Sequence, residues 1–245
     1  MFQFGDELKH YWRSLVRIVY PAYCVSCRIP LFLSETYLCT TCSQKVEPLK
    51  APLCLKCANP LPPYGSRLST CAQCRSERRY FDRGFALVKY QDPVRTILHQ
   101  VKFQKKLWLL KIFSEPLEQF SHSTQLKNYD VLIPVPLDTR RERERGFNQA
   151  LLIAQILAGR NREGVPVRQI LRKRKRTFPQ SQLKRQERLS NLNGAFLVKK
   201  RGSVRGKQLL LIDDIFTTGS KINECAKILK EDGAECVDFL TIARS

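Results

Sequence analysis

The sequence predicts an α/β protein that has a mostly parallel open sheet, with a small cysteine-rich module in front of it. Segments with the patterns of strands and of helices alternate after Arg79, as they do in parallel sheets. Eight of the ten cysteines come before residue 75, in a stretch that is rich in proline and has few long periodic segments. The 245 residues suffice for one large or two small domains, and 43% of them are hydrophobic, so a sizeable core can form.

These patterns divide the chain into three parts. The parts are an amphipathic helix within residues 1–20, the cysteine-rich module at 21–79 and the sheet domain at 80–245. In the helix, expected at 5–20, Leu8, Trp12, Leu15 and Val19 share one face. That face packs on the body of the protein or, as the weaker alternative, lies on a membrane surface.

The early cysteines form four Cys-x-x-Cys pairs. The pairs are Cys24/Cys27, Cys39/Cys42, Cys54/Cys57 and Cys71/Cys74. Two such pairs about a dozen residues apart can complete a tetrahedral site of four thiolates, as in zinc ribbons, whereas a redox motif normally has a single pair. We therefore predict two structural zinc ions. Pairing in chain order is our choice, and a cross-braced arrangement stays open.

The elements of the sheet domain follow from hydrophobic periodicity. A strand is predicted at 85–90, and a helix at 93–103 because Val94, Ile97 and Val101 recur on one face. A second helical segment at 107–120 is limited by a proline at position 116. The remaining strands are predicted at 129–135, 194–198, 208–213 and 236–243, and the remaining helices at 147–158 and 221–231.

The charge balance indicates the kind of partner. Lys and Arg number 43 and Asp and Glu 22, a formal net charge of +21. This favours an anionic partner such as nucleic acid, a phosphorylated small molecule or a membrane surface. No apolar run is long enough to span a membrane, and Asp6, Glu7 and Arg13 interrupt what would be the apolar part of a signal peptide. We expect a cytoplasmic protein without a transmembrane segment, whose thiols stay reduced.

The positive charge is concentrated in residues 160–207. That region has sixteen Lys or Arg and two Glu, and it contains the basic run Arg172, Lys173, Arg174, Lys175 and Arg176. A run of this kind is either a solvated loop or an anion-binding segment. Because it lies between two predicted strands, we predict that it binds nucleic acid. Aromatic residues are sparse there, which favours contacts dominated by phosphates.

One segment, LLLIDDIFTTGS at 209–220, carries the most specific chemistry. An aliphatic strand runs into Asp213 and Asp214, and a polar turn then leads into a helix. The backbone N–H groups of such a turn can hold a phosphate, helped here by Thr217, Thr218, Gly219 and Ser220. Two acids beside a phosphate suit the vicinal hydroxyls of a ribose that carries that phosphate at its 5′ position. The alternative is an ordinary strand that ends in an aspartate helix cap.

This segment resembles the phosphoribosyl diphosphate (PRPP) motif of type I phosphoribosyltransferases. With three other blocks, the chain resembles the ComF family of competence-associated proteins over about residues 20–245. The blocks are HQVKF at 99–103, PVPLDTRRERERGFNQA at 134–150 and RTFPQSQLKRQERLSNLNGAF at 176–196. The resemblance implies a double zinc ribbon in front of a type I phosphoribosyltransferase fold, and a role in the handling of transforming single-stranded DNA.

The resemblance also implies roles for individual residues. Asp213 and Asp214 would bind the ribose hydroxyls, and the turn at 217–220 the 5′-phosphate. Arg141 and Arg145 would meet the pyrophosphate, and Arg176 belongs to a mobile hood at 176–188 that closes over the substrate. The catalytic set is thus Asp213, Asp214 and Arg176. Lys221 stands where the family usually has Thr or Ser, and its ammonium would contact the phosphate instead.

Two functions follow as expectations. The first is a PRPP-binding protein with Mg²⁺ accompanying the ligand, which handles single-stranded DNA in natural competence together with other competence proteins. The alternative is an active phosphoribosyltransferase with no direct role on DNA. It would displace pyrophosphate from PRPP by a nucleobase or an amine, through a cationic transition state.

Overall fold

The computed structural model describes most of the chain. The described residues are 20–62, 69–123, 126–159, 164–174 and 194–245. Apart from Tyr20, the helix predicted at 5–20 lies outside them, as do Lys175, Arg176 and the hood at 176–188. In the part of the chain that is described, no helix is long and apolar enough to cross a membrane.

The chain forms two compact units. One lies within Met1–Glu47 and Gln91–Ile112, and the other within Pro48–Tyr90 and Phe113–Ser245. The first cysteine cluster (Cys24, Cys27, Cys39 and Cys42) therefore shares a unit with a helix of the expected sheet domain. The second cluster (Cys54, Cys57, Cys71 and Cys74) shares a unit with the sheet itself. The domain boundary predicted at residue 79 stays a prediction.

The first unit combines the first two cysteine pairs with two helical segments. Its elements are α2 (Thr40–Gln44), α4 (Val94–Gln104) and most of the 3-10 helix η1 (Leu107–Phe113). The buried Gln100 side chain donates a hydrogen bond to the carbonyl of Val25 at 2.7 Å, which joins α4 to the first ribbon. The ring of Trp108 lies 5.1 Å from that of Tyr37, measured between centroids.

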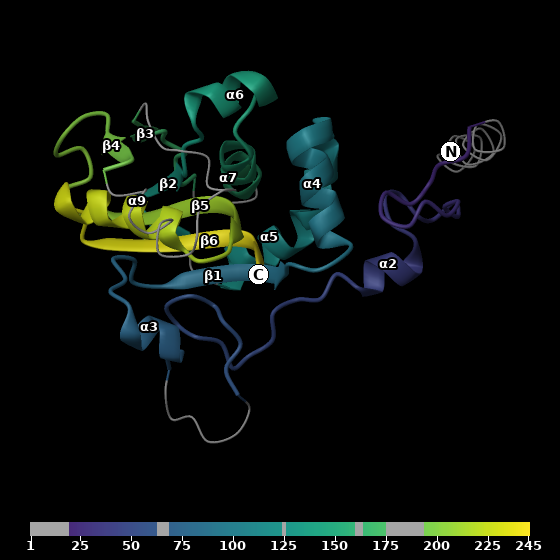
Figure 1. Cartoon of the computed structure of the whole chain (residues 1–245), viewed down its shortest axis with the longest axis horizontal. Helices are drawn as coiled ribbons and strands as arrows, with labels where there is room; N and C mark the ends of the chain where they lie inside the picture. The colour runs from purple at the N-terminus through teal and green to yellow at the C-terminus, as the bar shows by residue number, and fades with distance from the viewer. Residues whose placement is uncertain (1–19, 63–68, 124–125, 160–163, 175–193) are drawn as a thin grey trace, which may run out of the picture. The chain divides into compact units, whose positions relative to one another are not determined.

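The second unit is built on a four-stranded sheet (Figure 1). Its strands are, in spatial order, β1 (Gly84–Lys89), β6 (Cys236–Arg244), β5 (Gln208–Phe216) and β2 (Val131–Pro134). All neighbouring strands are parallel, which confirms the predicted parallel open sheet. Leu209 of β5 lies opposite Val131 on one side and Val237 on the other. The carboxyl ends of β5 and β2 therefore meet at one edge, where open α/β sheets bind ligands.

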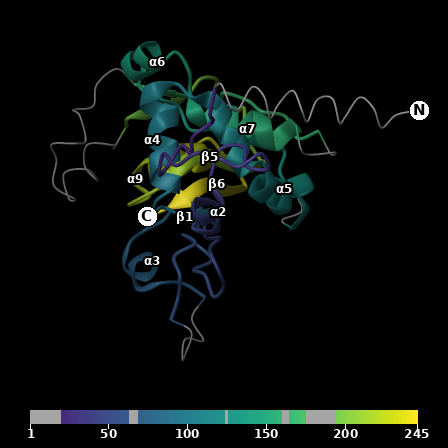
Figure 2. The same cartoon turned by 90° about the vertical axis from the view of Figure 1, so that its right-hand side faces the viewer.

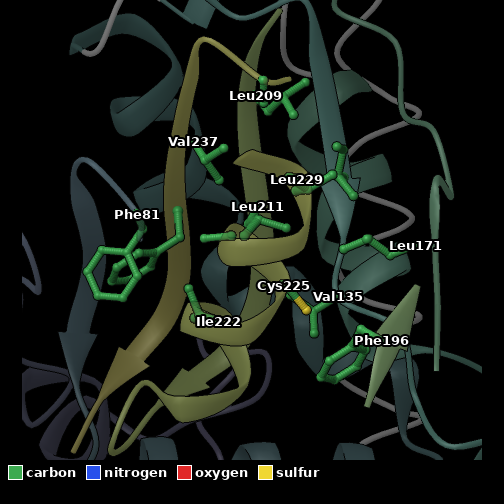
Figure 3. Packing of buried hydrophobic residues seen from close by; sticks show 14 of the residues in the cluster. Phe81, Val135, Leu171, Phe196, Leu209, Leu211, Ile222, Cys225, Leu229 and Val237 are labelled. Atoms are coloured by element: carbon green, nitrogen blue, oxygen red, sulfur yellow. The ribbon is translucent and has the colours of Figure 1, made fainter. Parts of the chain in front are cut away.

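Helices cover both faces of the sheet. Figure 2 shows α9 (Ser220–Glu231) on one side of β5 and β6, with α7 (Gln149–Gly159) and α5 (Ser114–Ser123) on the other. Leu209 and Leu211 pack in a cluster with Ile222 and Leu229 of α9 (Figure 3). Because both faces are covered, the run of aliphatic residues from 209 to 212 is buried without alternation, as is usual for parallel strands.

Three elements differ from the sequence prediction. The segment predicted as one helix at 107–120 is divided into η1 and α5, and Pro116 lies in the first turn of α5, where its missing N–H costs little. A short helix, α6 (Thr139–Arg145), follows β2 without having been predicted. The basic run begins in a strand, β3 (Leu171–Lys173), which pairs with β4 (Phe196–Val198) in a separate antiparallel pair.

The second cysteine cluster packs directly on the sheet. Cys54, Cys57 and Cys71 belong to the same buried cluster as the sheet residues and α9, and α3 (Ala72–Ser76) follows Cys71. The N–H of Gly84 at the start of β1 donates a hydrogen bond to the carbonyl of Leu55 at 3.0 Å. The ribbon and the first strand thus share backbone contacts as well as a core.

A Gly84→Ala substitution tests this close packing. A Cβ at position 84 would overlap both the ring of Phe239 and the backbone carbonyl of Lys56. We expect a loss of about 1–3 kcal/mol in the free energy of unfolding, measured by urea denaturation. Gly159→Ala is the matched control, because a Cβ there meets no atom within 4 Å, and it should change stability by less than about 1 kcal/mol. Equal effects of the two substitutions would contradict the packing argument.

Candidate functional site

The two acids at the end of β5 are buried and have different neighbours. Asp213 is 4% exposed and Asp214 7%. A carboxylate oxygen of Asp213 lies 2.6 Å from the Nζ of Lys221, on the first turn of α9. Asp214 acts electrostatically on Arg145 of α6. Because consecutive side chains of a strand point to opposite faces, Asp213 and Asp214 lie on opposite faces of the sheet at this edge.

The turn between β5 and α9 has the geometry of an anion site. Gly219 has φ of 75°, and a Cβ there would overlap the ring of Phe216, so only glycine fits. The N-cap residue of α9, Gly219, has no side chain to cap the helix, and the N–H of Ser220 donates a long hydrogen bond of 3.4 Å to the hydroxyl of Thr218. The hydroxyls of Thr218 and Ser220 are 2.8 Å apart and hydrogen-bonded to each other. The first N–H groups of a twelve-residue helix thus open onto a polar turn, the arrangement that binds phosphate groups.

Lys221 and Asp213 form a coupled ion pair. Burial raises the pKa of Asp213, and so does the neighbouring Asp214, whereas Lys221 lowers it. Burial opposes the charged form of Lys221, yet Asp213 and Asp214 together raise its pKa. The ammonium stays protonated and offsets the cost of the buried carboxylate. The Lys221 side chain is also 36% exposed, so it can reach a ligand at the turn.

The loop after β2 brings further cations to this edge. Asp138 caps α6 by accepting a hydrogen bond from the Arg140 N–H, and Gly146 ends the helix with φ of 81°. Burial and the nearby charge of Arg141 lower the pKa of Arg145, whereas Asp214 acts in the opposite direction. The two predicted pyrophosphate residues, Arg141 and Arg145, therefore act electrostatically on each other, and Asp214 acts on Arg145.

The residues of the basic run point in different directions. Arg172 and Arg174 are exposed. Lys173, predicted to bind nucleic acid, is only 16% exposed in its side chain and lies 3.6 Å from Asp138. Burial lowers its pKa, Asp138 raises it, and Arg141 and Lys221 lower it further. Lys173 thus points toward Asp138 at the start of α6, whereas Arg172 is exposed, because the side chains of consecutive strand positions face opposite ways.

The eight early cysteines form two clusters in chain order. The clusters are Cys24, Cys27, Cys39 and Cys42, and Cys54, Cys57, Cys71 and Cys74, with the Sγ atoms of each within 4.8 Å of one another. Sγ–Sγ distances of 3.6 Å occur across each cluster. Four sulfurs around zinc at about 2.3 Å would be about 3.8 Å apart. Both clusters fit a structural zinc site, and the grouping excludes the cross-braced alternative.

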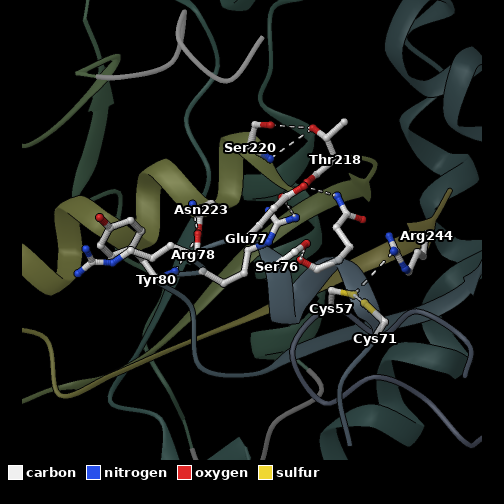
Figure 4. A network of polar contacts seen from close by, with 12 residues as sticks. Cys57, Cys71, Ser76, Glu77, Arg78, Tyr80, Thr218, Ser220, Asn223 and Arg244 are labelled. Carbon is white, nitrogen blue, oxygen red and sulfur yellow. Dashed lines mark hydrogen bonds and ion pairs between the residues drawn. The ribbon is translucent and has the colours of Figure 1, made fainter. Parts of the chain in front are cut away.

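Sequence reasoning missed the residues that join the second cluster to the turn. Arg79 donates a hydrogen bond to the carbonyl of Thr218 at 3.2 Å. Figure 4 shows Arg244 beside Cys57, to whose Sγ it donates at 3.8 Å. Asn223 of α9 accepts a hydrogen bond from the Tyr80 N–H at 2.8 Å. These partners are 139, 187 and 143 positions apart in the chain, so no local pattern reveals them.

Comparison with known families agrees with this geometry. The family model "Double zinc ribbon domain" matches residues 15–77, and the model "Phosphoribosyl transferase domain" matches residues 144–245. These matches confirm the predicted fold class, a type I phosphoribosyltransferase fold preceded by a double zinc ribbon.

Three relatives are similar over nearly their whole length. "Competence protein F" of Haemophilus influenzae is 29% identical over 91% of this chain and 96% of its own. "DNA utilization protein YhgH" of Salmonella typhi is 31% identical over 92% of this chain and 98% of its own. "Competence protein ComFC" of Bacillus subtilis is 28% identical over 88% of this chain and 87% of its own. The chain therefore belongs to the ComF family, which includes competence protein F and DNA utilization protein YhgH.

Proposed function

We propose that this protein binds PRPP at the carboxyl edge of its sheet. The observation that carries the proposal is the buried pair Asp213 and Asp214 directly before the polar turn that leads into α9, whose N-cap residue is Gly219 and so supplies no capping side chain. The 5′-phosphate would accept hydrogen bonds from the backbone N–H groups at 218–221, with Lys221 beside it. The carboxylates would accept hydrogen bonds from the ribose hydroxyls, as acids next to a phosphate site can.

The pyrophosphate of the ligand would lie toward α6 and β3. Arg141, Arg145 and Lys173 supply positive charge there, and the like charge of Arg141 lowers the pKa of both Arg145 and Lys173. Arginines bind phosphate oxygens with charge-assisted hydrogen bonds, and Mg²⁺ would accompany the pyrophosphate as its counterion. Arg176 stays a predicted contact from the hood, outside the described residues.

We also propose that the protein handles single-stranded DNA in the cytoplasm during competence, together with other competence proteins. The names of its relatives support this role, as does the net charge of +21. Aromatic side chains suited to base stacking are exposed in the first unit: Phe103 is 62% exposed and Trp108 43%. Residues 94–114 hold five Lys or Arg and no acid, so these rings lie among positive charges.

The alternative is turnover of PRPP by a nucleobase or an amine. The cations that would bind pyrophosphate could also stabilise it as it leaves the anomeric carbon. Binding and turnover use the same residues, so an assay of pyrophosphate release with a panel of acceptors distinguishes them. Release that depends on one acceptor and not on DNA would favour the enzyme.

Loss of the acid pair should abolish PRPP binding. We expect Asp213→Asn with Asp214→Asn to remove measurable affinity in calorimetry, because neutral amides replace the charged acceptors. Asp130→Asn is the matched control: Asp130 accepts a hydrogen bond from the N–H of Gln208 at the opposite end of β5, so it should leave affinity unchanged. Unchanged affinity in the double variant, with the fold intact, would contradict the site.

The ion pair predicts a pH effect. Lys221 lowers the pKa of Asp213, so Lys221→Met should raise that pKa further. The fall in PRPP affinity on acidification should then begin at a higher pH than in the parent, because protonated Asp213 accepts hydrogen bonds poorly. Lys227→Met, on the same helix, should leave the pH profile unchanged. A uniform loss of affinity at every pH would mean that Lys221 only contacts phosphate.

The basic run should separate into two functions. Arg172→Gln with Arg174→Gln removes the exposed charges and should weaken single-stranded DNA binding, reducing the log–log salt slope by about 0.7 for each phosphate that is no longer neutralised. Lys173→Gln should instead weaken PRPP binding.

Phe103→Ala should weaken DNA binding by about tenfold because a base can no longer stack on the ring, with Phe32→Ala as an exposed aromatic control. Equal effects of all variants on both ligands would contradict the assignment.

A further inference from the structure

We propose that Arg79 and Arg244 are positioning residues that hold the phosphate-binding turn in shape, so that the turn depends on the second cysteine cluster and its zinc. The inference rests on the proposed binding of PRPP at this turn and adds the element that determines its affinity. It concerns only the second unit, which contains both the cluster and the turn.

The first connection runs through Arg79. Its side chain is only 3% exposed, and its guanidinium lies 5.8 Å from the centre of the Phe81 ring. One terminal nitrogen donates to the carbonyl of Thr218 at 3.2 Å, and the other donates to the carboxylate of Glu77 at 2.6 Å. Glu77 directly follows α3, the helix that carries Cys74. The buried guanidinium of Arg79, itself held by Glu77 of the ribbon, therefore fixes the orientation of the peptide group of Thr218 in the turn.

The second connection runs through Arg244. Its Nη2 donates to the Sγ of Cys57 at 3.8 Å and to the Oδ1 of Asn59 at 3.0 Å. Its guanidinium lies over the ring of Phe216, 4.8 Å from the centroid. The opposing constraint is Gly219, whose Cα is so close to the same ring that a Cβ would overlap it. Displacement of Arg244 would remove one of the groups that hold the ring against which the turn packs.

A third contact fastens the chain after the ribbon to α9. The side-chain oxygen of Asn223 accepts a hydrogen bond from the Tyr80 N–H at 2.8 Å, and its amide nitrogen donates to the carbonyl of Arg78 at 3.4 Å (Figure 4). Residues 78–80 thereby contact both the 217–220 segment, through Arg79, and the first helical turn of α9, through Asn223. The ribbon supports the whole anion site, from Phe216 to Asn223.

Zinc at the second cluster would stabilise this support in two ways. Four thiolates and one zinc carry a charge of about −2, which strengthens the hydrogen bond from Arg244. The metal also supplies folding free energy to a segment too small to form its own core. When the metal is removed, Cys57 and the residues after Cys74 lose their fixed positions. The amides at 218–221 would then sample other orientations, and the affinity for a phosphate would fall.

The experiment compares Arg79→Met with Arg78→Met. Arg78 is exposed and adjacent, so it controls for the loss of one positive charge. We expect Arg79→Met to lower PRPP affinity at least about tenfold in calorimetry, from the loss of a charged hydrogen bond, and to speed amide hydrogen exchange at 218–221 in the ligand-free protein. Arg78→Met should do neither, and Arg79→Lys should recover part of both. Unchanged affinity and exchange in Arg79→Met would overturn the proposal.

Zinc dependence is tested with one cysteine from each cluster. Cys74→Ser and Cys27→Ser should each lower the zinc content by about one ion per chain. Only Cys74→Ser should speed exchange at 218–221 and weaken PRPP binding; equal effects of both variants would overturn the proposal. If the parent protein does not bind PRPP, the proposed function fails, and amide exchange alone then decides whether the second cluster positions the turn.

Discussion

The contact between the ring of Phe216 and Gly219 is the constraint on which the site depends. The ring stacks on Phe239 at 4.8 Å and lies beneath the guanidinium of Arg244, which itself donates a hydrogen bond to Cys57 of the second ribbon. Only glycine fits against the ring at this position, and the chain then begins α9 without a capping side chain on its N-cap residue. The buried acids Asp213 and Asp214 precede the ring on the same strand. One strand-to-helix turn therefore positions both the carboxylates and the backbone N–H groups at the start of α9.

The second ribbon and the sheet share one hydrophobic core. The Cys54, Cys57 and Cys71 side chains share a buried cluster with Phe81 and Phe239, and a small metal module thereby gains a core that it could not form alone. A zinc ion at the second cluster would stabilise the residues that support the turn.

The main elements could be predicted because they carry strong local signals. The aliphatic run at 209–212 predicted β5, and the cysteine spacing predicted two metal clusters. Helix α6 was missed because TRRERER has no apolar stripe, although Asp138 and Gly146 mark its ends. Pairing of the clusters in chain order was one of two possibilities that spacing allows. The contact of Lys173 with Asp138 and the contacts of Arg79 and Arg244 depend on distant segments, so periodicity could not reveal them.

A crystal structure of the protein with PRPP and Mg²⁺ tests the central claim most directly. The account predicts the 5′-phosphate at the N–H groups of 218–221, the ribose hydroxyls at Asp213 and Asp214, and the pyrophosphate toward Arg141 and Arg145. Phe216 and Gly219 should keep their contact in the complex. A ligand bound with its pyrophosphate at the 218–221 turn, or bound away from the carboxyl edge of β5, would contradict the account.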